Sequence, residues 1–146
     1  MNVLNLSKHL NKLGQSIAAC GVLVGASATA ADIALVIEGY EQIQGTSYIS
    51  IYNSQASYDA EKNAVFLAQM APASHTLRIT LHDLADGEYA VKMFHDENDN
   101  GQLDTNMLGI PSEPYGFSNE AGAFGPASFE DAKVTVKGDT ELRIKL

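Results

Sequence analysis

Oxygen-bearing side chains recur at alternate positions in one short segment near the middle of the chain. Counted from Asp96, carboxylate or amide oxygens fall at positions 1, 3, 5 and 9, a glycine falls at position 6, and the candidate ligands are Asp96, Asn98, Asn100, Gln102 and Asp104. These are the ligand positions of an EF-hand-type calcium loop, in which position 7 offers its backbone carbonyl. Because a hard cation needs about six to eight oxygens, the chain must curl around it, and glycine permits the sharp bend. The spacing predicts a calcium site.

The segment departs from an EF-hand at its end and in its surroundings. Position 12 is Met107 instead of a bidentate Glu, and the pair 110–111, Ile-Pro, cannot be helical. The sequence therefore predicts a calcium loop on a different fold, with Asn106 or Glu113 supplying the missing oxygen. With only two charged ligands, the expected dissociation constant is about 10⁻⁴–10⁻³ M. The alternative is a metal-free turn, because tight surface turns also use Asn, Asp and Gly.

A second loop, rich in aromatic, Pro and Gly residues, follows between 107 and 129. A long loop without regular structure is usually functional or held by its own packing. We interpret its aromatic residues as a satellite core beneath the loop. The alternative is an aromatic-lined binding surface beside the cation. On that alternative, the ligand contacts come from Tyr115, Phe117, Glu113 and His95.

Catalytic patterns are scarce, and a non-catalytic protein is favoured over an enzyme. The chain has no G-x-S-x-G or H-E-x-x-H motif, no Gly-rich phosphate loop and no Cys/His set. Alternation places His95 on the inward face of its strand, within reach of a hydrogen bond to the loop. A hydrolase acting on an envelope polymer needs His95 with Glu113 or Asp96 in a cleft. A purely structural module is the third possibility, with no pocket and a dispensable cation.

Period-two alternation of apolar residues predicts the elements that position these loops. Seven such runs occur, at 33–37, 48–52, 64–69, 77–81, 89–94, 134–136 and 142–146. Runs of this kind separated by Gly, Asn, Asp or Pro predict an all-β fold, an antiparallel two-sheet sandwich of about seven strands. The segment 54–62 fits one or two helical turns or a polar loop equally well. The pattern from Leu84 to Val91 resembles strands of prealbumin-like and carboxypeptidase-regulatory-type sandwiches.

The first thirty residues have the pattern of a secretory signal peptide. Basic residues precede an apolar, small-residue run, and Ala28 and Ala30 form an A-x-A cleavage pattern. The predicted organisation is a signal peptide over 1–30 and a β-sandwich domain over 31–146, located in the periplasm or secreted. The alternative is a lipoprotein anchored through Cys20, but most apolar residues follow that cysteine. No later segment approaches the ~20 apolar residues of a membrane span.

Composition narrows the classes of partner. The chain has 146 residues, with 9 Lys or Arg against 18 Asp or Glu, a net charge of −9. An excess of acid disfavours nucleic acid and favours cations. A single Cys excludes an intrachain disulfide framework and a Cys-based zinc site. The remaining partners are an unknown envelope or extracellular ligand or protein.

Three blocks of the sequence resemble one bacterial family. They run over residues 95–106, HDENDNGQLDTN, 109–119, GIPSEPYGFSN, and 124–132, FGPASFEDA. Together they resemble the family called domain of unknown function 2141, with the likeness covering residues 33–146. The resemblance implies an exported β-sandwich and no assigned activity. We therefore expect an exported, non-catalytic module whose calcium loop supports a ligand- or partner-contacting loop.

Overall fold

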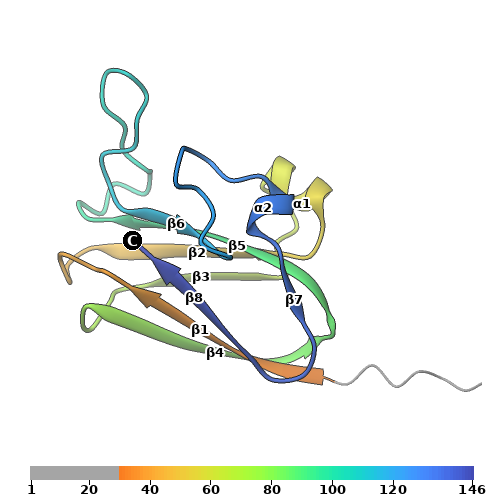
Figure 1. The fold of residues 1–146 in the computed structure, drawn as a ribbon. Coiled ribbons are helices and arrows are strands. Elements are labelled where there is room, and N and C mark those ends of the chain that lie inside the picture. Colours follow the sequence, from red (N-terminus) through yellow and green to blue (C-terminus); the bar gives the residue numbers. More distant parts are fainter. Residues whose placement is uncertain (1–29) are drawn as a thin grey trace, which may run out of the picture.

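The computed structural model describes residues 30–146, which form two β-sheets and two short helices (Figure 1). Residues 1–29 of the predicted leader, Cys20 among them, lie outside the described part. The strands and helices are β1 (Ala30–Glu38), β2 (Thr46–Tyr52), α1 (Gln55–Ala60), β3 (Phe66–Met70), β4 (Thr76–Ala85), β5 (Gly87–Asp96), β6 (Tyr115–Phe117), α2 (Phe129–Ala132), β7 (Val134–Val136) and β8 (Thr140–Lys145). In the described residues, no helix is long and apolar enough to cross a membrane.

The strands pair into a three-stranded sheet, β4-β1-β8, and a five-stranded sheet, β3-β2-β5-β6, in which β7 also pairs with β5. This confirms the predicted all-β sandwich of two sheets. One pair, β1 with β8, is parallel, unlike the others. This parallel pairing follows from the short connection between the end of β7 and the start of β8. Because β7 pairs with the start of β5, the turn after it brings Thr140 beside Ile33, near the start of β1.

Alternating apolar residues from both sheets fill the space between them. On β1 the inward set is Ile33, Leu35 and Ile37, all fully buried, and on β5 it includes Val91 and Met93. Alternate side chains of β1 and β5 therefore point into the core, as their period-two pattern predicts. At about 25 cal/mol per Å² of apolar surface, this burial is the main favourable term in folding.

A second, smaller apolar cluster lies on the outer face of the five-stranded sheet, beneath the helices. Its buried members are Tyr52, Tyr58, Ala90, Phe117, Phe129 and Ala132. It confirms the interpretation of a satellite core for Phe117 and Phe129. Phe124 departs from it, because its side chain is fully exposed.

The two helices are short and begin at serine caps. Ser54 Oγ accepts the N–H of Ser57 at the start of α1, which resolves segment 54–62 in favour of a helix. Ser128 Oγ accepts the N–H of Asp131 at the start of α2. The sequence predicted neither α2 nor β6. The four residues of α2 are too few to show a helical period, and β6 lies inside a loop rich in Pro and Gly, with Gly116 at its centre.

Ser118 lies directly after the end of β6, beside the edge of β5. Its side chain is fully buried. The Oγ accepts the N–H of Val91 at 2.8 Å and donates to the carbonyl of Ala132. Ser118 thereby replaces a backbone partner in the gap between β6 and β7, which pair with successive parts of β5.

We expect Ser118→Ala to destabilise the fold by about 1–3 kcal/mol, because it leaves the buried N–H of Val91 without its acceptor. Urea unfolding followed by circular dichroism measures this as a lower midpoint. Ser112→Ala is the matched control, because Ser112 is exposed and should change little. Equal midpoints for the two variants would contradict the role of Ser118.

Candidate cation and ligand site

The predicted calcium loop begins at the buried carboxylate that ends β5. Asp96 is fully buried. Its Oδ1 accepts the N–H of Asn100 at 3.1 Å, and its Oδ2 accepts the N–H of Gly101 at 2.6 Å. Gly101 has φ of +80°, a conformation that favours glycine. The chain therefore curls around Asp96 at the position where the sequence pattern requires a bend.

Three further predicted side chains converge above this bend. Asn98 Oδ1 accepts the N–H of Asn100 at 3.0 Å, and Asn100 Oδ1 accepts that of Gln102 at 2.8 Å. The Asp104 carboxylate accepts the amide Nδ2 groups of Asn98 at 2.7 Å and Asn100 at 2.9 Å. Asp96, Asn98, Asn100 and Asp104 thus share one loop. Gln102, whose backbone carbonyl is the predicted ligand, has an exposed side chain.

Glu113 joins the two ends of the loop. Its side chain is almost buried, at 7% exposed. Oε1 accepts the N–H of Glu97 and Oε2 accepts the N–H of Asp104, each at 2.9 Å. Of the two residues proposed to supply a missing oxygen, Glu113 therefore lies at the loop. Asn106 does not contact it through its side chain, because Oδ1 accepts the N–H groups of Leu108 and Ile110 instead.

The start of β2 supports the loop from below. A Cβ at Gly45 would lie 2.2 Å from the carbonyl oxygen of Asp96, so only glycine allows this approach. Thr46 Oγ1 donates to Asp99 Oδ1 at 2.7 Å. The close approach of Gly45 to Asp96 and the hydrogen bond from Thr46 to Asp99 therefore attach the loop to the start of β2.

The charge around the loop is negative. No Lys or Arg occurs from 93 to 132. Among the described residues, no group of three or more His, Cys, Asp or Glu side chains is placed to hold a metal ion. A cation in this loop would therefore use the amide oxygens of Asn98 and Asn100, and backbone oxygens, beside Asp96 and Asp104.

His95 points into the protein, as the alternation predicts. The ring is fully buried, and its Nδ1 lies 3.2 Å from Ser47 Oγ, which in turn lies 2.8 Å from the Tyr40 hydroxyl. Nε2 has no hydrogen-bond partner. The contact to the loop comes from the backbone, because the His95 N–H donates to the carbonyl of Pro114. The groups of the hydrolase alternative, His95, Asp96 and Glu113, are thus all buried, and both carboxylates accept backbone N–H groups.

An aromatic row crosses the outer face of the five-stranded sheet. Tyr48, Phe94 and Tyr115 stand opposite one another on β2, β5 and β6. The rings of Tyr48 and Phe94 are stacked, with centroids 4.8 Å apart. Sequence reasoning identified Tyr115 but missed the other two. The sequence does contain a signal for Tyr48 and Phe94: both are aromatic residues at outward positions of strands whose opposite face is buried.

Loop 96–106 forms one wall of a groove over this row. The groove has a volume of about 490 Å³, and Gly101, Gln102 and Leu103 line it together with the aromatic row. Tyr115 and Phe117 also line a neighbouring hollow of about 760 Å³, which Arg143 and Lys145 border on β8. Tyr115 is therefore partly exposed at both hollows, whereas Phe117 is mostly buried in the outer apolar cluster and the ring of His95 lies in the core.

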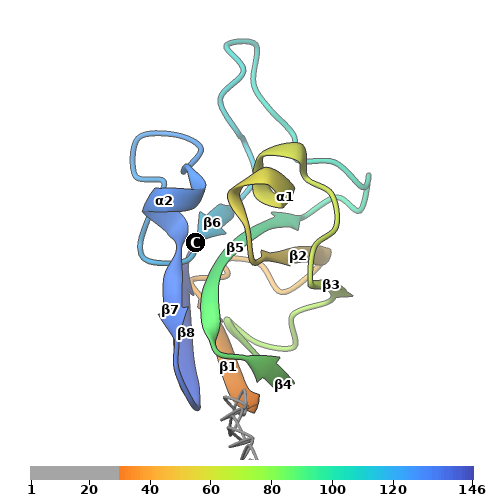
Figure 2. The same cartoon turned by 90° about the vertical axis from the view of Figure 1, so that its right-hand side faces the viewer.

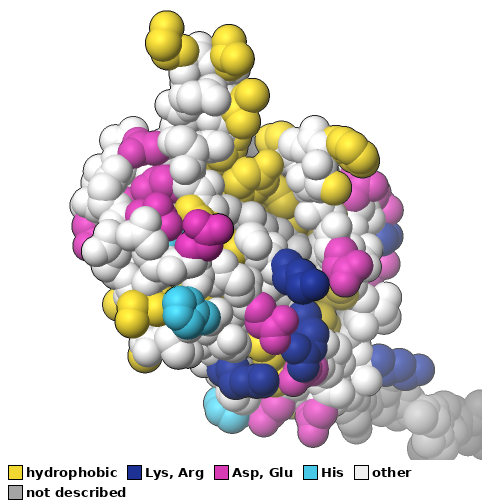
Figure 3. Space-filling model, turned by 60° about the vertical axis from the view of Figure 1, so that its left-hand side comes forward, with side chains coloured by type: hydrophobic (Ala, Val, Ile, Leu, Met, Phe, Trp, Pro, Cys, Tyr) yellow, Lys and Arg dark blue, Asp and Glu magenta, His cyan; other side chains and the backbone are white. Residues whose placement is uncertain are grey.

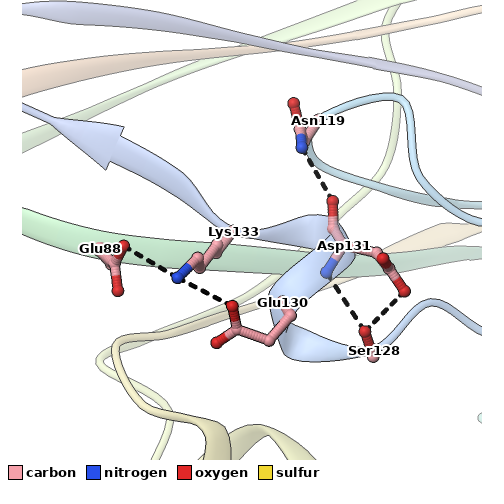
Figure 4. Close-up of polar contacts among 6 residues, drawn as sticks. All are labelled: Glu88, Asn119, Ser128, Glu130, Asp131 and Lys133. Atoms are coloured by element: carbon pink, nitrogen blue, oxygen red, sulfur yellow. Dashed lines mark hydrogen bonds and ion pairs between the residues drawn. The ribbon is translucent and has the colours of Figure 1, made fainter.

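The loop after β6 returns to the sheet through α2 (Figure 4). Asn119 Nδ2 donates to the carbonyl of Asp131 at 2.9 Å. Lys133 Nζ lies 2.9 Å from Glu130 and 3.1 Å from Glu88 on β5. Hydrogen bonds to Glu130 and Glu88 raise the pKa of Lys133. These contacts fix the loop from 119 to 128 beside the groove.

Tyr58 of α1 joins the helix to that loop. Its hydroxyl donates to the carbonyl of Ala127 at 2.9 Å. Lys92 Nζ lies 4.0 Å from the Tyr58 ring centroid and 2.9 Å from Glu61 Oε1. Burial, with the nearby charges of Asp59 and Glu61, raises the pKa of Tyr58 to about 12.

The raised pKa of Tyr58 predicts a loss of stability in alkali. Above pH 10 an unfolded chain releases this proton, while the folded chain retains it up to about pH 12. Rising pH therefore favours the unfolded state across this window. Thermal unfolding from pH 9 to about pH 12 should show a falling Tm, with a shallower fall for Tyr58→Phe. Parallel curves for the two proteins would contradict the assignment.

The clamp by Glu113 predicts a local and a global effect of substitution. Glu113→Gln replaces one accepting oxygen by an NH₂ group, so the N–H of Glu97 or Asp104 loses its acceptor. We expect a loss of about 1–3 kcal/mol in the free energy of unfolding and faster amide exchange at one of these residues. Glu120→Gln, at an exposed position, is the control. Unchanged exchange at both amides would show that the clamp is dispensable.

Comparison with known proteins places the chain in a family without assigning an activity. No curated protein and no solved structure matches the chain. The model of a family described as an uncharacterized protein conserved in bacteria, DUF2141, matches residues 35–145. The match includes strands of both sheets, loop 96–106 and the groove. The chain therefore belongs to the DUF2141 family.

Proposed function

We propose that this protein is an exported, non-catalytic binding module in which calcium holds loop 96–106 and thereby supports the ligand-contacting loop 107–129. The observation that carries the proposal is the convergence of Asp96, Asn98, Asn100 and Asp104 in a loop that also lines the aromatic groove. The ligand is an envelope or extracellular molecule or protein. Export rests on the leader pattern over 1–30.

Electrostatics supports a cation in this loop. Asp104 draws two amide nitrogens toward itself, and Asp96 draws two backbone N–H groups. Each of these contacts partly neutralises a carboxylate in a region without Lys or Arg. A dipositive ion beside Asp96 and Asp104 would neutralise these carboxylates more completely than amide dipoles do.

The groove supports a binding role for the neighbouring surface. It combines the aromatic rings of Tyr48, Phe94 and Tyr115 with the polar side chains of Ser50 and Gln102. Apolar rings with a few polar groups are typical of ligand sites. Because Gly101–Leu103 form its wall, ordering of the calcium loop would preorganise this surface and reduce the entropy lost on binding.

We expect calcium to raise the Tm of the protein. With a Kd of about 1 mM, about 10 mM calcium stabilises the folded state by about 1.4 kcal/mol, or about 5 °C in Tm. Asp104→Asn should abolish most of this increase, because it removes one of the two charged ligands. Calorimetric scans with calcium and with chelator measure both effects.

The control is Asp59→Asn, which makes the same change of charge at an exposed position on α1. It should keep the full calcium response. If Asp104→Asn responds to calcium as strongly as the unmodified protein, the ion acts by general screening, and the proposed site is wrong. The same conclusion follows if calcium leaves the Tm of the unmodified protein unchanged.

A further inference from the structure

A hairpin with exposed apolar side chains projects from the sandwich beyond the calcium loop (Figures 1 and 2). It spans residues 105–112, and a bridge between Thr105 and Pro111 closes it. Met107 is 104% exposed, Leu108 83% and Ile110 56%. Figure 3 shows hydrophobic side chains at the projecting end of the molecule. Large apolar side chains gathered at an exposed tip indicate an interaction surface.

Several backbone groups of the hairpin are paired within it and with Asp104. Asn106 Oδ1 accepts the N–H groups of Leu108 and Ile110. The backbone carbonyl of Asn106 accepts the N–H of Gly109. The N–H of Asn106 donates to Ile110, and that of Ser112 donates to Asp104. Pro111 has no N–H. These hydrogen bonds lower the cost of moving the hairpin toward an apolar medium, because each unpaired polar group there costs several kcal/mol.

The distribution of apolar side chains favours a fluid surface over a protein pocket. Residues 105–112 include no charged side chain. Met107 and Leu108, adjacent at the tip, are both almost completely exposed, so neither of them packs against the rest of the hairpin. A protein interface would cover one face of such a finger, whereas the interfacial region of a bilayer surrounds it on every side.

The charge at the base of the hairpin indicates which lipids fit. From 93 to 132 the chain has no Lys or Arg, and the carboxylates of Glu97, Asp99 and Asp104, in the loop at the base of the hairpin, are at least partly exposed. Such a surface repels anionic headgroups and attracts ammonium groups. The complementary surface is a bilayer of zwitterionic lipids with exposed ammonium groups.

We propose that hairpin 105–112 inserts its tip into the interface of a zwitterionic, phosphatidylethanolamine-containing bilayer. Met107, Leu108 and Ile110 enter the boundary between headgroups and acyl chains, about 5–10 Å deep. Asp104 and Glu113, at the two ends of the hairpin, stay at the level of the headgroups. This surface activity goes beyond the proposed function, and it requires neither calcium nor a ligand in the groove.

The chain has no Trp, so Leu108→Trp introduces a single fluorescent reporter at the tip. The probe is a vesicle of phosphatidylethanolamine and phosphatidylcholine, with EDTA present. We expect the emission of Leu108→Trp to shift to shorter wavelength and the full chain to float with the vesicles. Met107→Ser with Leu108→Ser should lower the partition coefficient at least about tenfold, because both side chains lose their transfer into apolar surroundings.

Leu67→Ser is the control, because Leu67 is also a largely exposed leucine but lies on β3. It should leave flotation unchanged, and thermal scans should show that all variants fold. Unchanged Trp emission with these vesicles overturns the proposal, and so does equal or stronger binding to phosphatidylglycerol vesicles in EDTA. The proposal is also wrong if the tip variants abolish self-association in sedimentation instead, because the partner is then a second copy. Since EDTA removes calcium, each of these failures is distinct from a failure of the cation site.

Discussion

The arrangement of the site depends on one buried charge, the carboxylate of Asp96 at the end of β5. A carboxylate without exposure to water is strongly unfavourable unless hydrogen bonds compensate it. The N–H groups of Asn100 and Gly101 supply that compensation, so the chain must turn back over Asp96 within five residues. This turn brings Asn98 and Asn100 to Asp104 and places Gly101–Leu103 against the groove. A single electrostatic requirement thus determines both the oxygen cluster and the wall beside the aromatic row.

The same strand arranges the surroundings of the loop through its alternation. Successive residues of β5 place Met93 and His95 in the core and Lys92 and Phe94 on the outer face. The strand also pairs with β2, β6 and β7, so the aromatic side chains of β2 and β6 have a fixed register with Phe94. Because the aromatic row and Asp96 belong to one hydrogen-bonded unit, their relative positions do not depend on a flexible connection.

Much of this organisation follows from the sequence, and the parts that do not have definite causes. Alternation predicted the long strands and the inward position of His95, since these depend on local periodicity and one buried face. The turn around Asp96 was predictable because Asx turns and Gly101 act within a few residues. The row of Tyr48, Phe94 and Tyr115 depends on which strands are neighbours, and periodicity does not contain that information. The capping role of Asn106 was missed for a related reason: the same side chain suits a metal ligand and a turn, and only the fold decides between them.

The cation loop and the hairpin are mechanically linked, although the two proposals made for them are independent. Glu113 binds the N–H of Asp104, and the carbonyl of Asp104 accepts the N–H of Ser112, so both ends of the hairpin are fixed to the loop. Any ion that binds Asp104 therefore acts at the base of the hairpin as well as at the wall of the groove. Neutralising carboxylates there also weakens the repulsion of anionic headgroups. A cation would thus alter which lipids the tip tolerates, whereas the apolar contacts of Met107 and Leu108 would stay the same.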